Sequence, residues 1–213
     1  MRTPAVALSL LLALASPATA DLIITEVYYD HVGTDADFEW VEIFNTGPGP
    51  VDLTGYTLGN GGTSYGYSTA PLQGTIASCE TFVIGSASTA DNGAPVIDLV
   101  FDFDPDFQNS GSTADGVALF GPGADPGTDC PIDAVIYGAS GSNANGLRDQ
   151  SCGLGDVDVG DTGSGASIER TSLAGDWVIQ ASPDPNAISF TISCDPVDAT
   201  AESWGTLKAD YRD

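Results

Sequence analysis

Basic residues are scarce in this chain of 213 residues, which carries 5 Lys and Arg against 30 Asp and Glu. The formal net charge is −25, so phosphate backbones and anionic lipid surfaces should repel the protein. We therefore expect no nucleic-acid partner. The same charge favours solubility and would attract cations or basic partners.

Familiar catalytic motifs are also missing. The sequence has no nucleophile elbow, phosphate-binding loop, dinucleotide fingerprint or His-Glu-x-x-His zinc motif. His31 is the only histidine, and no nucleophile or acid close to it in sequence clearly forms a catalytic group with it. We interpret His31 as a surface residue and predict that the protein is not an enzyme.

No apolar run is long enough for a permanent membrane span. The run Ala5–Ala15 follows Arg2 and precedes the small-x-small tripeptide Ala18-Thr19-Ala20, a pattern typical of a secretory signal peptide. We predict that residues 1–20 are removed. Because Arg2 is the only charged residue lost, the net charge moves from −25 to −26. The mature chain, beginning at Asp21, would be secreted or held at the cell surface without a membrane span.

Four cysteines remain after this cleavage: Cys79, Cys130, Cys152 and Cys194. An even number in an exported protein indicates two disulfides, with three pairings open. Cys130 and Cys152 flank one strand and one loop, so we pair them, and pair Cys79 with Cys194. A zinc site is the rival interpretation, but no two cysteines have Cys-x-x-Cys spacing.

The chain is rich in turn formers, with 26 Gly and 13 Pro, and its apolar runs are short. This composition is typical of many short strands joined by turns. Strands are expected at 21–29, 38–45, 51–58, 65–67, 81–85, 96–104, 114–120, 132–137, 167–171, 177–180 and 188–194. Tyr65 and Tyr67 either form a binding surface or cap the edge of the fold, and we favour the cap.

Three blocks in order resemble the lamin tail domain family in its bacterial secreted form. They are Ile24–Val27, Glu39–Asn45 and Val51–Leu58, and weaker matches extend to Ala187. The residues that carry the family pattern are Glu26, Glu39, Trp40, Glu42, Asn45, Gly55, Tyr56 and Trp177. The resemblance implies an all-β, immunoglobulin-like β-sandwich with long loops, here over residues 21–194, that binds or scaffolds and has no known active site.

Judged by residue type alone, Glu39 and Glu42 could form the carboxylate pair of a glycosidase. They occupy opposite-facing positions of one predicted strand, so they would not face a common sugar. We interpret Glu26, Glu39 and Glu42 as hydrogen-bonding or surface groups.

Two groups of aspartates have spacings that bear on calcium, which prefers several oxygen ligands. They are Asp102, Asp104 and Asp106, and, in a long loop between residues 138 and 166, Asp156, Asp158 and Asp161. The first group begins like an EF-hand loop, but Phe107 stands where Gly is needed and Thr113 where the bidentate Glu belongs. We favour a strand with its acids facing water, and keep calcium as an alternative.

Residues 195–213 form a separate tail. Trp204, Leu207 and Tyr211 fall on one face of a helix, and Lys208 and Arg212 are two of the four basic residues of the mature chain. The pattern predicts a short amphipathic helix, which either acts as a sorting signal or folds back on the acidic domain.

Together these features predict an exported, non-catalytic binding or structural module at the bacterial cell surface or outside the cell. Its partner would be a protein or a cell-surface polymer. The alternatives are a calcium-dependent adhesion module and an accessory domain of a secreted hydrolase or nuclease system. No cofactor is expected, apart from calcium in the first alternative.

Overall fold

The computed structural model describes residues 22–88, 94–109, 111–138 and 141–194. The predicted signal peptide and the predicted tail helix lie outside these residues. Strands make up all the regular structure in the described part, where no helix occurs. It follows that no helix among these residues could cross a bilayer.

The described residues form twelve strands in three sheets. The strands are β1 (Leu22–Tyr28), β2 (Trp40–Asn45), β3 (Val51–Asp52), β4 (Thr57–Gly61), β5 (Ser68–Pro71), β6 (Thr75–Ile76), β7 (Thr81–Gly85), β8 (Leu99–Val100), β9 (Asp115–Phe120), β10 (Asp133–Tyr137), β11 (Ser167–Arg170) and β12 (Trp177–Gln180). A six-stranded sheet has the order β12-β11-β1-β2-β7-β8, a four-stranded sheet the order β10-β9-β4-β5, and β3 pairs with β6.

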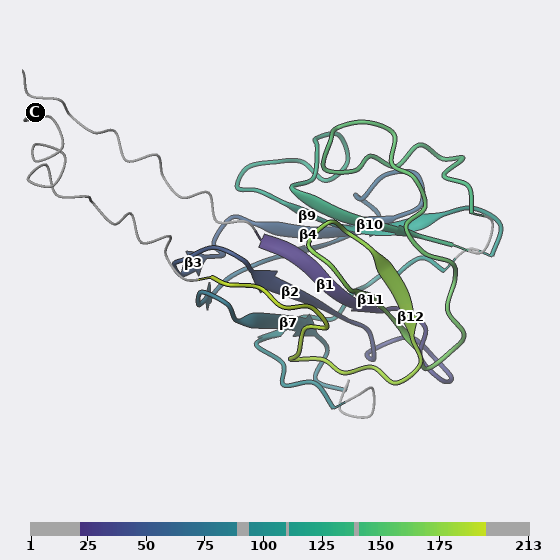
Figure 1. The fold of residues 1–213 in the computed structure, drawn as a ribbon. Coiled ribbons are helices and arrows are strands. Elements are labelled where there is room, and N and C mark those ends of the chain that lie inside the picture. The colour runs from purple at the N-terminus through teal and green to yellow at the C-terminus, as the bar shows by residue number, and fades with distance from the viewer. Residues whose placement is uncertain (1–21, 89–93, 110, 139–140, 195–213) are drawn as a thin grey trace, which may run out of the picture.

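The two larger sheets pack face to face, as Figure 1 shows, and form a β-sandwich. β-Branched and aliphatic residues of the six-stranded sheet, including Ile24, Val41 and Ile43, meet Leu58 and Val117 of the other sheet in one buried core. Because side chains alternate along a strand, the residues between these face outward. The predicted fold class, an all-β sandwich, is confirmed.

Two predicted strands differ from the observed ones because of local backbone geometry. The expected strand 51–58 is two strands, β3 and β4, separated by a turn in which Gly55 has a φ of 88°, a left-handed conformation that glycine adopts without strain. The expected strand 65–67 is absent, and the pairing strand is β5. The side chain of Tyr65 instead lies buried in a second small apolar cluster.

Two further strand predictions were wrong because apolar alternation does not guarantee a pairing partner. Of the expected strand 96–104, only β8 pairs, alongside the last residues of β7, and the chain then leaves the sheet as a loop. The segment 188–194 is not a strand either. Its alternating residues Ile188, Phe190 and Ile192 are half-buried, but the segment crosses the outer face of the six-stranded sheet instead of extending an edge (Figure 1).

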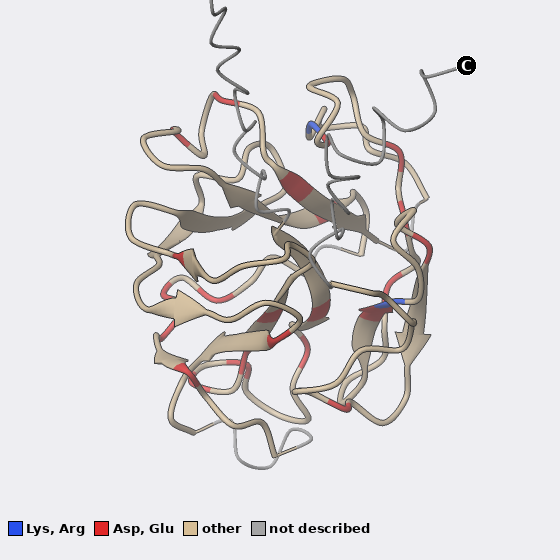
Figure 2. Ribbon diagram, turned by 60° about the vertical axis from the view of Figure 1, so that its left-hand side comes forward, with Lys and Arg blue, Asp and Glu red and all other residues tan. Residues whose placement is uncertain are grey.

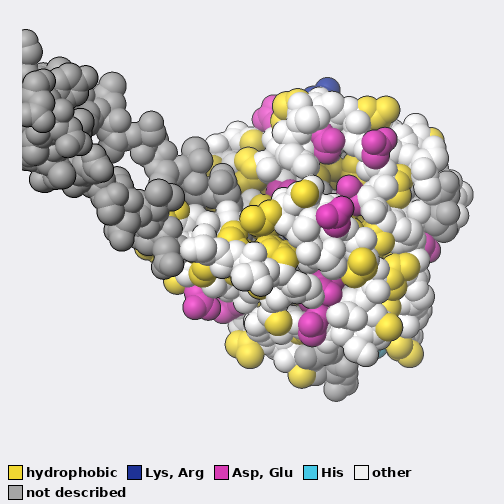
Figure 3. Space-filling model, viewed as in Figure 1, with side chains coloured by type: hydrophobic (Ala, Val, Ile, Leu, Met, Phe, Trp, Pro, Cys, Tyr) yellow, Lys and Arg dark blue, Asp and Glu magenta, His cyan; other side chains and the backbone are white. Residues whose placement is uncertain are grey.

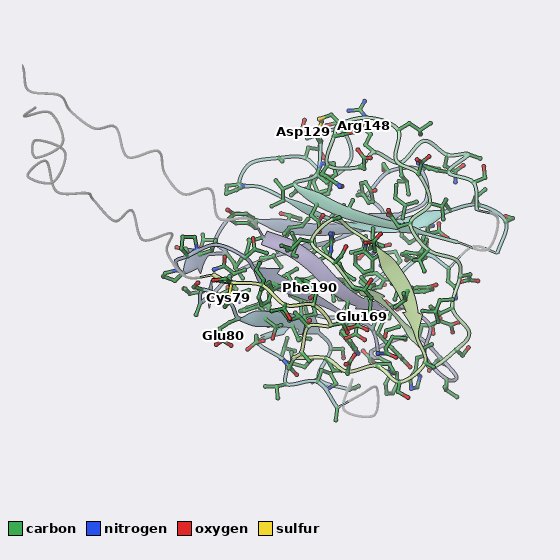
Figure 4. The ribbon with its side chains drawn as sticks, viewed as in Figure 1. Cys79, Glu80, Asp129, Arg148, Glu169 and Phe190 are labelled. Carbon is green, nitrogen blue, oxygen red and sulfur yellow. A yellow bond between two sulfur atoms is a disulfide. The ribbon has the colours of Figure 1, made fainter. Side chains whose placement is uncertain are left out.

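We call residues 181–194, which follow β12, the strap. The strap ends at Cys194, which forms a disulfide with Cys79, and a second disulfide joins Cys130 to Cys152. This is the pairing that the sequence analysis preferred. Figure 4 places the labelled Phe190 of the strap near Cys79 and Glu80, which precede β7. The strap is therefore fixed at both ends, by β12 and by a disulfide.

Candidate binding cleft and buried carboxyl groups

An open cleft of about 870 Å³ lies among loops that meet at one end of the sandwich. The loops are β1–β2, β4–β5, β8–β9 and β10–β11. The lining residues are Ala36, Asp37, Gly62, Thr63, Tyr67, Asp102, Asp104, Pro105, Asp106, Phe107, Gln108, Asn109, Thr113, Asp115 and Asn145. Five of these are aspartates and none is Lys or Arg, so the cleft has a negative potential.

The carboxyl groups of the cleft influence one another. Burial raises the pKa of Asp102, and the neighbouring Asp37 raises it further through its charge and a side-chain hydrogen bond. Burial likewise raises the pKa of Asp106, followed by the charges of Asp35 and Asp104. The ribbon in Figure 2 carries many Asp and Glu positions and few Lys and Arg positions. Among the described residues, Arg148 and Arg170 are the only Lys or Arg.

The candidate calcium ligands Asp102, Asp104 and Asp106 all line this cleft, from a loop and not from the predicted strand. They do not converge on one point. Within the described ranges, no group of three or more His, Cys, Asp or Glu side chains is arranged to hold a metal ion. These residues contribute negative charge to the cleft.

The second aspartate group is also divided among separate roles. Asp158 accepts a hydrogen bond from the backbone N–H of Ile136 at 2.8 Å, and burial raises its pKa to about 6. Asp161 accepts from the Tyr29 hydroxyl at 2.9 Å. Asp156 is exposed. Two of these aspartates thus hold the long loop against the sandwich.

Glu39 anchors the wall of the cleft from inside the protein. The backbone N–H of Phe107 donates to both of its carboxyl oxygens, at 2.9 and 2.8 Å, and Phe107 is buried behind the loop. Burial raises the pKa of Glu39 to about 9, and the charge of Asp106 adds to the rise. Glu39 is thus a buried hydrogen-bonding group, the first of the two roles that the sequence allowed, and not a surface group.

Glu26, Glu42 and Glu169 form a row on the outer face of the six-stranded sheet. Glu26 lies directly opposite Glu169 across β1 and β11, and directly opposite Glu42 across β1 and β2. All three are buried, beneath the strap. Glu26 and Glu42 are therefore hydrogen-bonded core groups, not surface groups, and neither presents its carboxyl group to a substrate.

The remaining family residues have structural roles. The Asn45 side chain donates to the carbonyl oxygens of Gly49, Ile76 and Ala77 and accepts from the N–H of Gly47, so it organises the turn after β2. The aromatic family residues make packing contacts. The Trp40 ring stacks on Tyr28 with the ring centroids 5.9 Å apart, and Tyr56 lies against the core. The centre of the Trp177 ring lies 5.0 Å from the Arg170 guanidinium.

Two further residues differ partly from expectation. His31 is half-buried and stacks on Phe38 with the ring centroids 4.0 Å apart, so it is not simply a surface residue. Tyr65 donates from its hydroxyl to the Arg148 carbonyl at 2.8 Å, whereas Tyr67 lines the cleft and is 48% exposed. Only Tyr67 is thus available to a partner.

Sequence reasoning missed several polar residues that the fold brings together. Asp37 and Asp115 belong to the cleft, and a Cβ on Gly62 would lie 2.4 Å from the Asp115 carboxyl oxygen, so a larger residue there would displace the Asp115 side chain. Asp133 forms a buried ion pair with Arg170. No spacing signal could have found this pair, because 37 residues separate its members.

The sequence of this chain matches one known family of domains. Residues 15–152 match the Lamin Tail Domain model. The chain belongs to the Lamin Tail Domain family. This family consists of non-enzymatic, immunoglobulin-like domains, in agreement with the observed sandwich. The match ends before β11 and β12, which extend the same sheet as β1 of this lamin tail domain.

Other comparisons are more distant. A crystal structure of a DUF4876 family protein from Bacteroides thetaiotaomicron is similar over 86% of this chain and 73% of its own, with 15% sequence identity and a TM-score of 0.45. No curated protein matches this lamin tail domain.

Proposed function

We propose that this lamin tail domain is an exported, non-catalytic binding module whose binding site is the acidic cleft. The partner presents cationic groups, either on a basic protein segment or on an amine-bearing polymer of the cell surface. The observation that carries the proposal is the cleft itself, with five aspartates and no Lys or Arg among its lining residues.

Electrostatic and steric features of the cleft support this partner chemistry. Carboxylates that raise one another's pKa gain from a nearby cation, because the cation offsets their mutual repulsion. The half-exposed Tyr67 ring adds a flat apolar surface with a negative face, on which ammonium and guanidinium groups pack favourably. Charge complementarity of this kind raises association rates and selects partners.

Export is supported by the covalent chemistry of the chain. All the described cysteines are paired in two disulfides, and disulfides form and persist in oxidising compartments. The amino-terminal pattern of residues 1–20 supports the same conclusion. The bacterial origin of the resemblance favours the cell surface or the medium as the location.

The binding proposal is tested by calorimetric titration of residues 21–194 with hexalysine at low and physiological salt. The variant Asp102→Asn with Asp106→Asn removes two cleft charges and should weaken binding about tenfold, since each exposed ion pair contributes up to about 1 kcal/mol. The weakening should diminish as salt is added.

A matched control separates the cleft from overall charge. Glu80→Gln with Asp156→Asn removes the same number of charges at exposed positions away from the cleft. We expect the affinity of this variant to stay within about twofold of that of the original protein. Such a change is small beside the tenfold change in affinity that about 1.4 kcal/mol produces. Equal losses in both variants would mean that hexalysine senses net charge only, and the cleft proposal would then be abandoned.

A further inference from the structure

The strap donates hydrogen bonds to the row of buried glutamates, and the Asn186 side chain also bonds the backbone of Val96 at 2.7 and 3.2 Å. The Asp184 N–H donates to Glu26 at 3.4 Å, and the Asn186 N–H donates to Glu42 at 2.5 Å. The Ser189 hydroxyl donates to Glu169. Each glutamate of the row therefore accepts one hydrogen bond from the strap, and the strap has no strand ladder of its own with the sheet.

Packing beneath the strap is incomplete. A hollow of about 360 Å³ lies between its second half and β2 and β7, and is lined by Phe44, Phe190 and Ile192 among others. Phe44 and Phe190 meet edge to face, with centroids 6.3 Å apart. These strap residues stay only half-buried, so their apolar contact with the sheet is partial.

Among the described residues, the surroundings of the row supply no positive charge. The strap places the carboxylate of Asp184 near the row. Its other neighbours are the neutral Gln180 of β12 and the apolar Val83 of β7. The segment before β8 adds Asp98, which accepts from the Val83 N–H at 2.9 Å. Arg170 follows Glu169 on β11 but faces the other sheet, where it pairs with Asp133.

Figure 3, which views this face, shows hydrophobic and acidic side chains interspersed, with basic colour only at the edge. Like charges directly opposite each other on neighbouring strands destabilise a sheet. Ionisation of both Glu26 and Glu42, which lie directly opposite each other, would therefore destabilise this part of the sheet.

We propose that the strap is a pH-dependent latch, docked on the glutamate row while Glu26 and Glu42 are protonated and released as these groups ionise. The Cys79–Cys194 disulfide keeps the released strap tethered. The outer face of β1, β2 and β11 is then uncovered without separation of the chain.

The direction of the pH effect follows from linkage. Burial, followed by hydrogen bonds that partly oppose it and by neighbouring carboxylates, raises the pKa of Glu26 and of Glu42 from 4.5 to about 8. In the released state water surrounds both groups, so their pKa returns toward about 4.5. The contribution of protonated Glu26 and Glu42 to docking is therefore fully present below about pH 4.5, and each ionising group weakens docking about tenfold per pH unit up to about pH 8.

The test is hydrogen exchange of residues 21–213 between pH 5 and 9, corrected for the intrinsic pH dependence of amide exchange. Protection of the Asp184 and Asn186 amides should fall at least tenfold between pH 6 and 9. Protection of β9, in the opposite sheet, should stay constant. Constant protection of the strap, or a parallel loss in β9 that signals global unfolding, would overturn the latch.

Variants identify the groups responsible. Glu26→Gln with Glu42→Gln keeps hydrogen-bonding oxygens but cannot ionise, so its strap should stay protected up to pH 9. Glu80→Gln, an exposed control beside the disulfide, should behave like the original protein. If the double variant lost protection with the same pH profile, the proposal would be wrong.

A titration of the unaltered protein covers the case in which the double variant does not fold. The side-chain carboxyl carbons of Glu26 and Glu42, followed by NMR, should titrate with apparent midpoints well above 4.5, between that value and the value of about 8 for the docked strap, shared between the coupled groups. Midpoints near the ordinary value of about 4.5 would leave the latch without a trigger and overturn it.

Discussion

Arg170 is the residue whose replacement should destabilise this fold most clearly. Its guanidinium donates to both Asp133 carboxyl oxygens at 2.8 and 2.7 Å and to the Ile24 carbonyl at 2.8 Å. Asp133 also accepts from the Ile24 N–H at 2.7 Å. The pair thus links β11 and β1 of one sheet to β10 of the other, and both side chains are almost fully buried.

The magnitude follows from this burial. Arg170→Met keeps an apolar stem of similar length but leaves the Asp133 carboxylate buried without its counter-ion, which typically costs about 3–5 kcal/mol. Such a loss is a large part of the roughly 5–15 kcal/mol that stabilises an ordinary domain. Burial already raises the pKa of Asp133 even with Arg170 present, so in the variant the folded state retains a proton and loses more stability at pH 8 than at pH 5.

Urea unfolding with the disulfides intact, followed by tryptophan fluorescence, measures this difference. Arg148→Met, at an exposed position, is the matched control and should change the free energy of unfolding by less than about 0.5 kcal/mol. The double change Arg170→Met with Asp133→Leu should recover part of the loss, because no unpaired charge then remains. A loss below about 1 kcal/mol for Arg170→Met alone would refute the reasoning.

Three other predictions can be tested on the same protein. Replacing Cys79 and Cys194 by Ala opens a loop of 115 residues and should cost about 5 kcal/mol, against about 3 kcal/mol for the 22-residue separation of Cys130 and Cys152; equal costs in urea unfolding would contradict this ranking. The melting temperature should be the same with calcium and with chelator, since no three described ligands converge; a rise with calcium would favour the adhesion alternative. The intact mass of protein from the native host should correspond to a chain beginning at Asp21 with two disulfides, and a mass that retains residues 1–20 would refute export.

Strands that pair with a neighbouring strand could be predicted well from the sequence. The run Thr81–Gly85 and the run Trp177–Gln180 have the predicted bounds, because β-branched and aromatic residues mark a half-buried pleated surface. The alternation of apolar and polar residues was a poor guide at 96–104, where only β8 forms, and at 188–194, where no strand forms. Phe103 is buried and Asp102 and Asp104 are exposed as the alternation suggests, but a strand also needs a neighbour, which one sequence does not reveal.

The carboxyl groups were harder to place, because acids are mostly exposed and burial of an acid is decided by distant partners. The buried carboxyl group of Glu39 accepts a hydrogen bond from the N–H of Phe107, 68 residues away. That of Glu42 accepts one from the N–H of Asn186, 144 residues away. The loop acids that form the cleft also come from separate connections. Their spacing along the chain could not reveal that Asp37, Asp102, Asp104, Asp106 and Asp115 line one cleft.

The most direct test of the binding account is the location of a bound cation on the folded protein. We would record the amide NMR spectrum of residues 21–194 while adding hexalysine. The account predicts that signals of the cleft loops shift together, at Asp37, Gly62, the segment 102–109 and Asn145, while those of Asp156 and Glu80 do not. Shifts spread evenly over the acidic surface, or concentrated away from these loops, would contradict it.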